Sequence, residues 1–230
     1  MKKEVIIMVI GISGMISSGK STLTRNLVKH YKNSMMLKEY EEDDDVFNTF
    51  LKWLYEKQPN LTIGFQSYVV ENHTSKLADC FKKFSEKGYK YKDNHIFLDR
   101  FSIEHYIFAN VNLRTKGKKY LEGYDALFSH LITKDETPDL AIFLDMTFDT
   151  FKKRLFERGR EVETENWNKN KDYFRELYDL YKPLFIKQAK KYDLNYVIIE
   201  TDNLTEKQVF EKAVEVINNY DFSKMERYNK

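Results

Sequence analysis

The sequence predicts an α/β fold in which a five-stranded parallel sheet is covered by helices on both faces. Five short apolar segments alternate along the chain with longer segments of helical periodicity, which is the order of repeated strand–helix units. The first apolar segment leads directly into a glycine-rich loop and then into the start of a helix. The 230 residues fit one domain, residues 1–230, because no linker or internal repeat divides them.

The predicted strands are short apolar runs, which are typical of strands buried on both faces of a parallel sheet. They span Val5–Ile12, Met35–Leu37, Ile96–Leu98, Leu140–Leu144 and Tyr196–Ile199. Helical periodicity between them predicts helices that include Phe47–Tyr55, Phe65–Phe84, Ser102–Val111, Phe148–Arg158 and Asp172–Lys191. Gly159, directly after one of these segments, is a typical helix stop.

The composition excludes several classes of protein. The chain has 38 basic and 36 acidic residues, a formal net charge of +2, and this balance gives no reason to expect a nucleic-acid partner. The single cysteine, Cys80, excludes an internal disulfide framework and favours the reducing cytoplasm. Since the longest apolar run is too short to span a bilayer, no membrane partner is expected either.

Residues 14–21 carry the most specific motif of the chain. They read G-x-x-x-x-G-K-S and lie between the first predicted strand and the first helix. In this context backbone N–H groups converge on a phosphate, Lys20 reaches the outer phosphates and the Ser21 hydroxyl holds Mg²⁺. The chain is therefore expected to bind a nucleoside triphosphate. The predicted nucleotide-binding residues of the loop are Gly14, Met15, Ile16, Ser17, Ser18, Gly19, Lys20, Ser21 and Thr22.

Charged and polar residues follow the other predicted strands at the point where each strand ends. Lys38-Glu39 follows the second strand, Asp99-Arg100 the third, Asp145 the fourth and Thr201-Asp202 the fifth. Because ligands of open α/β sheets bind at the carboxyl ends of the strands, these groups are expected to gather beside the bound phosphates.

Three of these residues match the needs of phosphoryl transfer, which are a phosphate clamp, a metal and a group that activates the acceptor. Asp99 can hold Mg²⁺ directly or through water, Arg100 can neutralise charge on the transferring group, and Glu39 can accept a proton from a hydroxyl. Alternatives stay open: Asp99 and Arg100 could form a surface ion pair, and Glu41 or Glu42 could take the place of Glu39.

A cluster of arginines near the end of the predicted helix Phe148–Arg158 has two interpretations. Arg154, Arg158 and Arg160 are spaced so closely that two or three of them can fold over an anionic ligand as an Arg-rich lid. Cations at a helix C-terminus also interact favourably with the helix dipole when no ligand is present. The spacing alone does not separate these two roles.

Taken in order, five segments resemble the deoxyribonucleoside kinase family, which includes the deoxyadenosine, deoxyguanosine and deoxycytidine kinases and has a P-loop kinase fold. Gly14–Thr22 is similar to the family's phosphate loop, and Glu39 falls at the Glu of its Glu-Pro motif, with Tyr40 in place of Pro. Tyr55 and Gln66 keep the family's separation of eleven residues between a sugar-binding Tyr and a base-reading Gln.

The last two segments lie in the second half of the chain. Asp99-Arg100-Phe101 resembles the acidic-Arg-Ser motif, and residues 158–163 resemble the lid motif Arg-x-Arg-x-x-Glu. The resemblance implies 5′-phosphorylation of a deoxyribonucleoside by ATP and Mg²⁺ in nucleotide salvage, and a homodimer. Glu39, steadied by Arg100, would act on the 5′-hydroxyl, and Arg158 and Arg160 would close over the donor phosphates.

The resemblance also implies how the acceptor is read. Gln66 would pair with the base edge, whereas Tyr55 and Glu163 would bind the 3′-hydroxyl and leave no room for a 2′-hydroxyl. The family tunes base choice at two positions that are occupied here by His73 and His105. Two imidazoles favour a purine slightly over a pyrimidine, because a neutral ring offers one donor and one acceptor.

Two other classes of protein remain as alternatives. A thymidylate-kinase-like nucleoside monophosphate kinase shares the phosphate loop and an Asp-Arg-aromatic motif, which Asp99-Arg100-Phe101 fits. A regulatory protein that hydrolyses ATP slowly would need the phosphate loop but neither a base-reading Gln nor a lid Glu. Release of ADP from ATP with deoxynucleosides, with dTMP or with no acceptor distinguishes the three.

Overall fold

A computed structural model describes residues 8–38, 44–89 and 94–221, and it contains the predicted five-stranded sheet. All neighbouring strands are parallel, in the order β2-β3-β1-β4-β5. The strands are β1 (Met8–Gly14), β2 (Met35–Leu37), β3 (His95–Asp99), β4 (Leu140–Asp145) and β5 (Asn195–Glu200). Because the chain order reverses around β1, the residues that follow β1, β3 and β4 meet at one edge of the sheet.

The end of β1 differs from the predicted strand Val5–Ile12 in a way that matters for the site. The strand continues to Gly14, because its last residues remain paired with β4 up to Leu144. All seven residues of β1 are buried. The glycine-rich loop therefore starts on a strand residue that neighbouring strands hold in place, while Val5 and the residues beside it lie outside the described residues.

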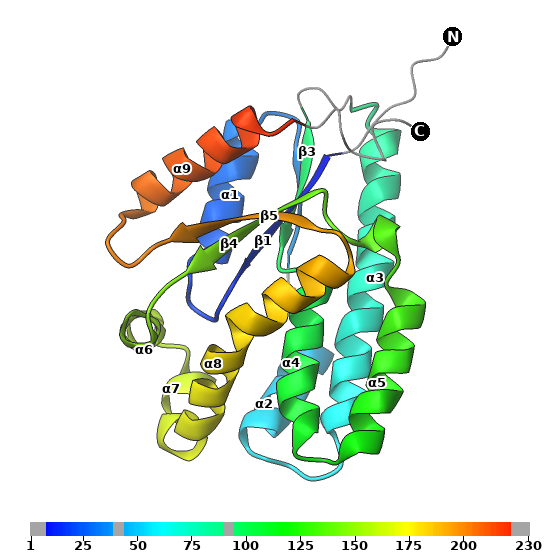
Figure 1. The fold of residues 1–230 in the computed structure, drawn as a ribbon, viewed down its shortest axis with the longest axis vertical. Helices are drawn as coiled ribbons and strands as arrows, with labels where there is room; N and C mark the ends of the chain where they lie inside the picture. The colour runs from blue at the N-terminus through cyan, green and yellow to red at the C-terminus, as the bar shows by residue number, and fades with distance from the viewer. Residues whose placement is uncertain (1–7, 39–43, 90–93, 222–230) are drawn as a thin grey trace.

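Helices cover both faces of the sheet, as predicted (Figure 1). Apolar residues of α1 (Lys20–His30) and α9 (Glu206–Asn219) pack on one face, against Ile10 and Ile12 of β1 among others. The other face packs against α3 (Thr62–Glu86), α4 (Ser102–Arg114) and α8 (Trp167–Lys191). Helix α5 (Lys118–Leu131) lies on the outer side of this layer and forms a further apolar cluster with α3 and α4.

Three shorter helices complete the fold: α2 (Asp45–Tyr55), α6 (Phe148–Arg158) and α7 (Glu161–Thr164). Helix α6 follows the carboxyl end of β4, and α7 comes directly after it (Figure 1). Each predicted helix lies within an observed one, whereas α5, α7 and α9 have no counterpart among the predicted segments. A short 3₁₀ turn lies at Lys134–Glu136.

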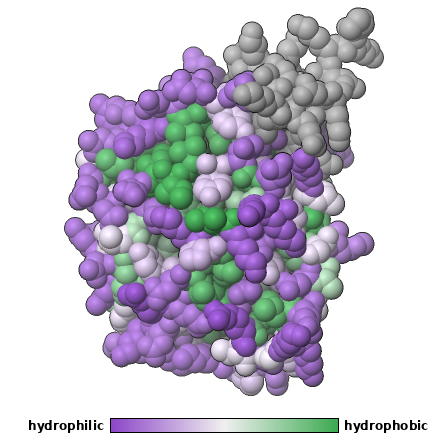
Figure 2. Space-filling model, viewed as in Figure 1, coloured by the Kyte–Doolittle hydropathy of each residue, from purple (hydrophilic) through white to green (hydrophobic). Residues whose placement is uncertain are grey.

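The sheet has an open edge at β5, and Figure 2 shows hydrophobic surface beside β5 and α9 with mostly hydrophilic surface around it. A hollow of about 1020 Å³ lies there between the two elements. Within residues 8–38, 44–89 and 94–221, no helix combines the length and apolar character needed to cross a membrane.

We predict that Gly11→Ala destabilises the fold. A Cβ atom at Gly11 would lie 2.6 Å from two ring carbons of the fully buried Phe101 and 2.9 Å from Pro138 Cγ. Overpacking of this kind costs about 1–3 kcal/mol, measurable as a lower free energy of unfolding in urea. In the control Gly64→Ala the new methyl group meets no atom within 4 Å, so stability should stay level or rise by up to about 1 kcal/mol. Equal stability of the two variants would contradict the prediction.

Candidate active site

The glycine-rich loop connects β1 to α1 through backbone conformations that residues other than glycine rarely adopt. Gly14 has a φ of +143°, and Gly19, the N-cap of α1, has a φ of +95°. A Cβ atom at Gly14 would lie 2.5 Å from the Leu144 carbonyl oxygen, so glycine is also required by space. The turn closes with a hydrogen bond from the Ser18 N–H to the Met15 carbonyl at 3.1 Å. A glycine-rich loop that leads from a strand into a helix in this way is the arrangement in which backbone N–H groups bind a phosphate.

The Lys20 side chain folds back over this loop. Its Nζ donates to the carbonyl oxygens of Gly14 at 2.7 Å and Met15 at 3.0 Å, and the residue is 5 % exposed. A buried ammonium held by neutral carbonyl groups can interact strongly with an anion that enters beside it. Lys20 therefore fits the predicted contact with the outer phosphates.

A cavity of about 710 Å³ opens in front of the loop, and its lining is strongly basic. Among the described residues that line it, seven are basic and two, Asp99 and Glu163, are acidic. The basic ones are Lys20, Arg25, Lys38, Arg100, Arg154, Arg158 and Arg160. Such an excess of cations around helix N-terminal amides favours a polyanion such as a triphosphate.

The end of β3 places its last residue, Asp99, and the following residue, Arg100, at the cavity, and both are almost fully buried. Arg100 has a left-handed φ of +73°, and its N–H donates to the Ile12 carbonyl at 3.2 Å, which ties it to β1. Its guanidinium carbon lies 4.7 Å from the centre of the Phe108 ring. The structure therefore excludes the alternative of a surface ion pair at this strand end, because both residues are buried at the cavity.

Two oxygen-bearing side chains in the cavity fit a magnesium ion. Ser21 lies in the first turn of α1, and both Ser21 and Asp99 line the cavity. Mg²⁺ prefers oxygen ligands and in such sites takes most of them from phosphates and water. Within the described part of the chain, no group of three or more His, Cys, Asp or Glu side chains could hold a metal ion.

The predicted lid residues Arg158 and Arg160 come together on a single carboxylate. Arg158 ends α6, and both its Nη2 and the Nη1 of Arg160 contact Glu163 on α7, the latter at 3.5 Å. Glu163 is 2 % exposed, whereas the two arginines are about one-third exposed. The arginines thus bridge the cavity mouth and the buried Glu163.

Arg154, the third arginine of this cluster, is held differently. Its guanidinium donates to the Thr201 hydroxyl at 2.9 Å and to the Thr201 carbonyl at 2.8 Å, which connects α6 to the end of β5. It still lines the cavity. Its position is therefore fixed by the sheet, unlike that of Arg158 and Arg160.

Tyr55 lies at the inner wall of the cavity near Glu163, and both are buried. Burial, and next the Glu163 carboxylate, raise the pKa of the Tyr55 hydroxyl well above its usual range. The hydroxyl therefore stays protonated at neutral pH and can donate a hydrogen bond, while Glu163 can accept one. This pair is suited to a ligand hydroxyl.

Beyond Tyr55 the cavity continues into a small pocket of about 60 Å³ that contains Gln66 and His105. The two hollows share walls made by Tyr55, Arg100 and Phe108. Gln66 is 3 % exposed, so its amide is directed at buried space rather than at solvent. A polar group in a largely apolar pocket is an arrangement that recognises the edge of a ligand.

His73 and His105 lie side by side, with ring centres 4.8 Å apart, but only His105 lines the small pocket. Burial lowers the pKa of His73 to about 4, and burial, His73 and Arg100 lower the pKa of His105 well below its usual value. Both rings are therefore neutral near pH 7. Among the described residues neither Nε2 atom has a hydrogen-bond partner. His73 thus supports His105 from behind instead of facing the pocket.

Three sequence-predicted residues cannot be placed: Glu39 and its alternatives Glu41 and Glu42 lie outside the described residues. Met15 contributes its backbone, since its side chain does not line the main cavity.

Sequence reasoning missed Glu104 and Tyr181, which contact Arg100. An acidic residue within the largely apolar helix α4 was a usable signal for Glu104, whereas nothing local indicates Tyr181, 81 positions from Arg100.

The chain belongs to the deoxynucleoside kinase family, whose model, described as "Deoxynucleoside kinase", matches residues 10–220. An uncharacterized protein of Mycoplasma pneumoniae is 32 % identical over 87 % of this chain and 86 % of its own length. The deoxyguanosine kinase of Lactobacillus johnsonii is 29 % identical over 91 % of this chain and 89 % of its own length.

A solved structure agrees with this assignment at the level of the fold. A deoxyadenosine kinase from M. mycoides superimposes with a TM-score of 0.70 at 22 % identity, over 93 % of this chain and all of that one. The protein is thus a deoxynucleoside kinase with the P-loop kinase fold.

We predict that Lys20→Ala nearly abolishes phosphoryl transfer and leaves the fold intact. The variant keeps the loop amides but loses the ammonium that faces the outer phosphates, and loss of one such donor costs roughly 10²–10³-fold in kcat. Steady-state release of ADP measures the effect, with the melting temperature as a check on folding. Lys29→Ala, on the exposed side of the same helix, is the matched control. Near-normal turnover of Lys20→Ala would contradict the assignment of the loop.

Proposed function

We propose that this kinase transfers the γ-phosphoryl group of ATP to the 5′-hydroxyl of a deoxyribonucleoside, with a purine slightly favoured, in nucleotide salvage. The observation that carries the proposal is the continuity of two unlike spaces. A basic cavity suited to a triphosphate leads, past Arg100 and Tyr55, into a small pocket with an amide and a neutral imidazole.

On the donor side, residues 14–22, which include Lys20, bind the phosphates. Arg158 and Arg160 form the lid that closes over them. Ser21 and Asp99 hold Mg²⁺, which when bound neutralises charge on the phosphate oxygens. Arg100 stabilises the negative charge that develops between donor and acceptor. These roles are supported by the joint position of the side chains on one cavity wall.

On the acceptor side, Gln66 pairs with the base edge, and Tyr55 and Glu163 bind the 3′-hydroxyl. Glu39 accepts the proton of the 5′-hydroxyl, a role that rests on its position in the sequence directly after β2. The same proposal places the enzyme in the cytoplasm as a homodimer without nucleic-acid or membrane partners. The Phe65-Gln66-Ser67-Tyr68 segment favours a nucleoside as the acceptor over the nucleoside monophosphate of a thymidylate-kinase-like enzyme.

Base choice is assigned to His105, supported by His73. A neutral imidazole presents one donor and one acceptor nitrogen, and it cannot repel or attract a base by charge. Purine N7 together with a neighbouring exocyclic group matches this pattern, whereas a thymine methyl group gains nothing from it.

A panel of the four deoxynucleosides, assayed with ATP and Mg²⁺, tests the function and the base choice together. We expect deoxyadenosine or deoxyguanosine to have the highest kcat/KM, and His105→Ala to change the ranking because His105 lines the pocket. His130→Ala, on α5 and exposed, serves as the control. The purine preference is wrong if thymidine or deoxycytidine is the best substrate, and His105 is a bystander if its removal leaves the ranking unchanged.

We further predict that the enzyme discriminates strongly against ribonucleosides. Buried polar groups that fit one pattern of hydroxyls reject another, by up to about 10⁴–10⁵ in kcat/KM where the site is fully closed. The measurement compares adenosine with deoxyadenosine, in the parent and in Tyr55→Phe, which should lose part of the discrimination. Similar high efficiency on both nucleosides would show that Tyr55 and Glu163 do not surround the sugar as proposed.

A further inference from the structure

We propose that Glu104 is a positioning residue that aligns Arg100 with the phosphate loop through one carboxylate oxygen. The proposal rests on the proposed function, because its readout is phosphoryl transfer. Glu104 lies on α4, four residues after Arg100, and is not part of the segments that carry the family resemblance. Its side chain does not line the cavity. It therefore acts through its contacts and is not a catalytic residue.

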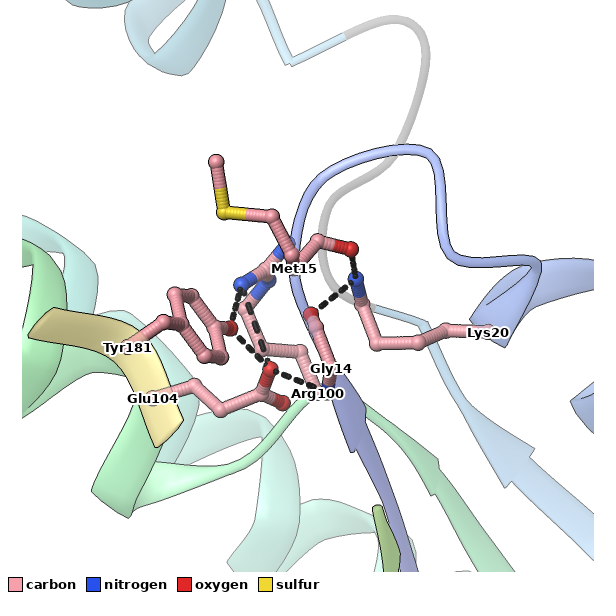
Figure 3. A network of polar contacts seen from close by, with 6 residues as sticks. All are labelled: Gly14, Met15, Lys20, Arg100, Glu104 and Tyr181. Carbon is pink, nitrogen blue, oxygen red and sulfur yellow. Dashed lines mark hydrogen bonds and ion pairs between the residues drawn. The ribbon is translucent and has the colours of Figure 1, made fainter. Parts of the chain in front are cut away.

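Three donors from three elements converge on Glu104 Oε1 (Figure 3). The Gly14 N–H at the end of β1 donates at 3.2 Å, and Arg100 Nη1 after β3 donates at 3.3 Å. The Tyr181 hydroxyl of α8 donates to the same oxygen. Because these elements are far apart in the sequence, Glu104 is a point where the sheet and two helices are fixed relative to one another.

The charges explain why this contact is specific. Glu104 is fully buried and Arg100 is 4 % exposed. Because water solvates neither charge, the carboxylate and the guanidinium stabilise each other. Arg100 Nη1 also donates to the Tyr181 oxygen at 2.7 Å. Two acceptors behind the guanidinium and the Phe108 ring beside it restrict its orientation. Its direction toward the cavity is therefore set before any ligand binds.

Gly14 extends the alignment to the donor side. Its N–H donates to Glu104, while its carbonyl oxygen accepts from Lys20 Nζ at 2.7 Å. Figure 3 shows Glu104 and Tyr181 on one side of the Gly14 backbone and Lys20 on the other. The cation assigned to the transferring group and the cation assigned to the outer phosphates are thus connected through one glycine. A displacement of Glu104 would shift Arg100 relative to Lys20.

Tyr181→Phe is the mildest test, because it removes one hydroxyl and keeps the packing of the ring. We expect kcat to fall roughly tenfold, the size of one hydrogen bond to a charged group, with the KM for ATP and the deoxynucleoside within about twofold. Tyr178→Phe on the same helix is the matched control, since its hydroxyl donates to the Met146 carbonyl outside this network. An unchanged kcat in folded Tyr181→Phe would overturn the proposal.

A double-mutant cycle then separates positioning from simple stabilisation. Glu104→Gln should lower kcat roughly 10- to 100-fold in the parent, but should have little further effect in Arg100→Met, because Glu104 acts through Arg100. An equal loss in both backgrounds would mean a structural role and overturn the proposal. If Glu104→Gln does not fold, the Tyr181→Phe result decides.

The parent enzyme is assayed first on the deoxynucleoside panel, so the two proposals fail differently. A parent that phosphorylates no deoxynucleoside overturns the proposed function and, with it, this inference. An active parent whose network variants keep the parent kcat overturns the positioning role alone.

Discussion

The backbone of Gly14 is the point on which the site depends. It ends the central strand, and its N–H and carbonyl groups hold Glu104 on one side and Lys20 on the other. Its positive φ and the 2.5 Å approach to the Leu144 carbonyl that a Cβ atom would make exclude other residues. Because β1 pairs with both β3 and β4, the loop inherits the rigidity of the sheet. Anion-binding N–H groups are effective only if they are held in place in this way.

The site also buries an unusual amount of charge. Lys20, Asp99, Arg100, Glu104 and Glu163 are all 5 % exposed or less. Buried charges are costly unless they are paired, and among the described residues Arg100 pairs with Glu104, while Arg158 and Arg160 pair with Glu163. The same low dielectric that makes buried charges costly strengthens the interaction of a buried cation with any anion that enters the cavity.

The small pocket that contains Gln66 and His105 differs from the basic cavity in its electrostatics. Arg100 stands at its edge, and His105 and His73 behind it are neutral because burial and the neighbouring cation lower their pKa values. In the unfolded chain both imidazoles would take up protons near pH 6.5. Folding with neutral rings is therefore favourable above that pH and becomes less so as the pH falls toward 4. The two imidazoles therefore offer hydrogen-bonding nitrogens without charge, and Arg100 is the charged residue among those described at this pocket.

Most of the fold and much of the site could be predicted from the sequence, because their signals are local. The strand, glycine loop and helix of residues 14–21 follow from neighbouring residues, and so do the positions of Asp99 and Arg100 at a strand end. The family resemblance also paired Tyr55 with Gln66, and both residues line one pocket in the structure.

Contacts between distant residues were decided by the tertiary structure. Tyr181 meets Glu104 and Arg100 only because α8 packs on α4 across the sheet face, and no local pattern marks a tyrosine for this task. Likewise, the family resemblance assigned base choice to both His73 and His105. Helix packing determines that His105 lines the small pocket, whereas His73 packs against the His105 ring. The physical reason is the same in both cases: local periodicity sets which face of a helix is buried, whereas the partner on that face depends on how the helices pack against the sheet.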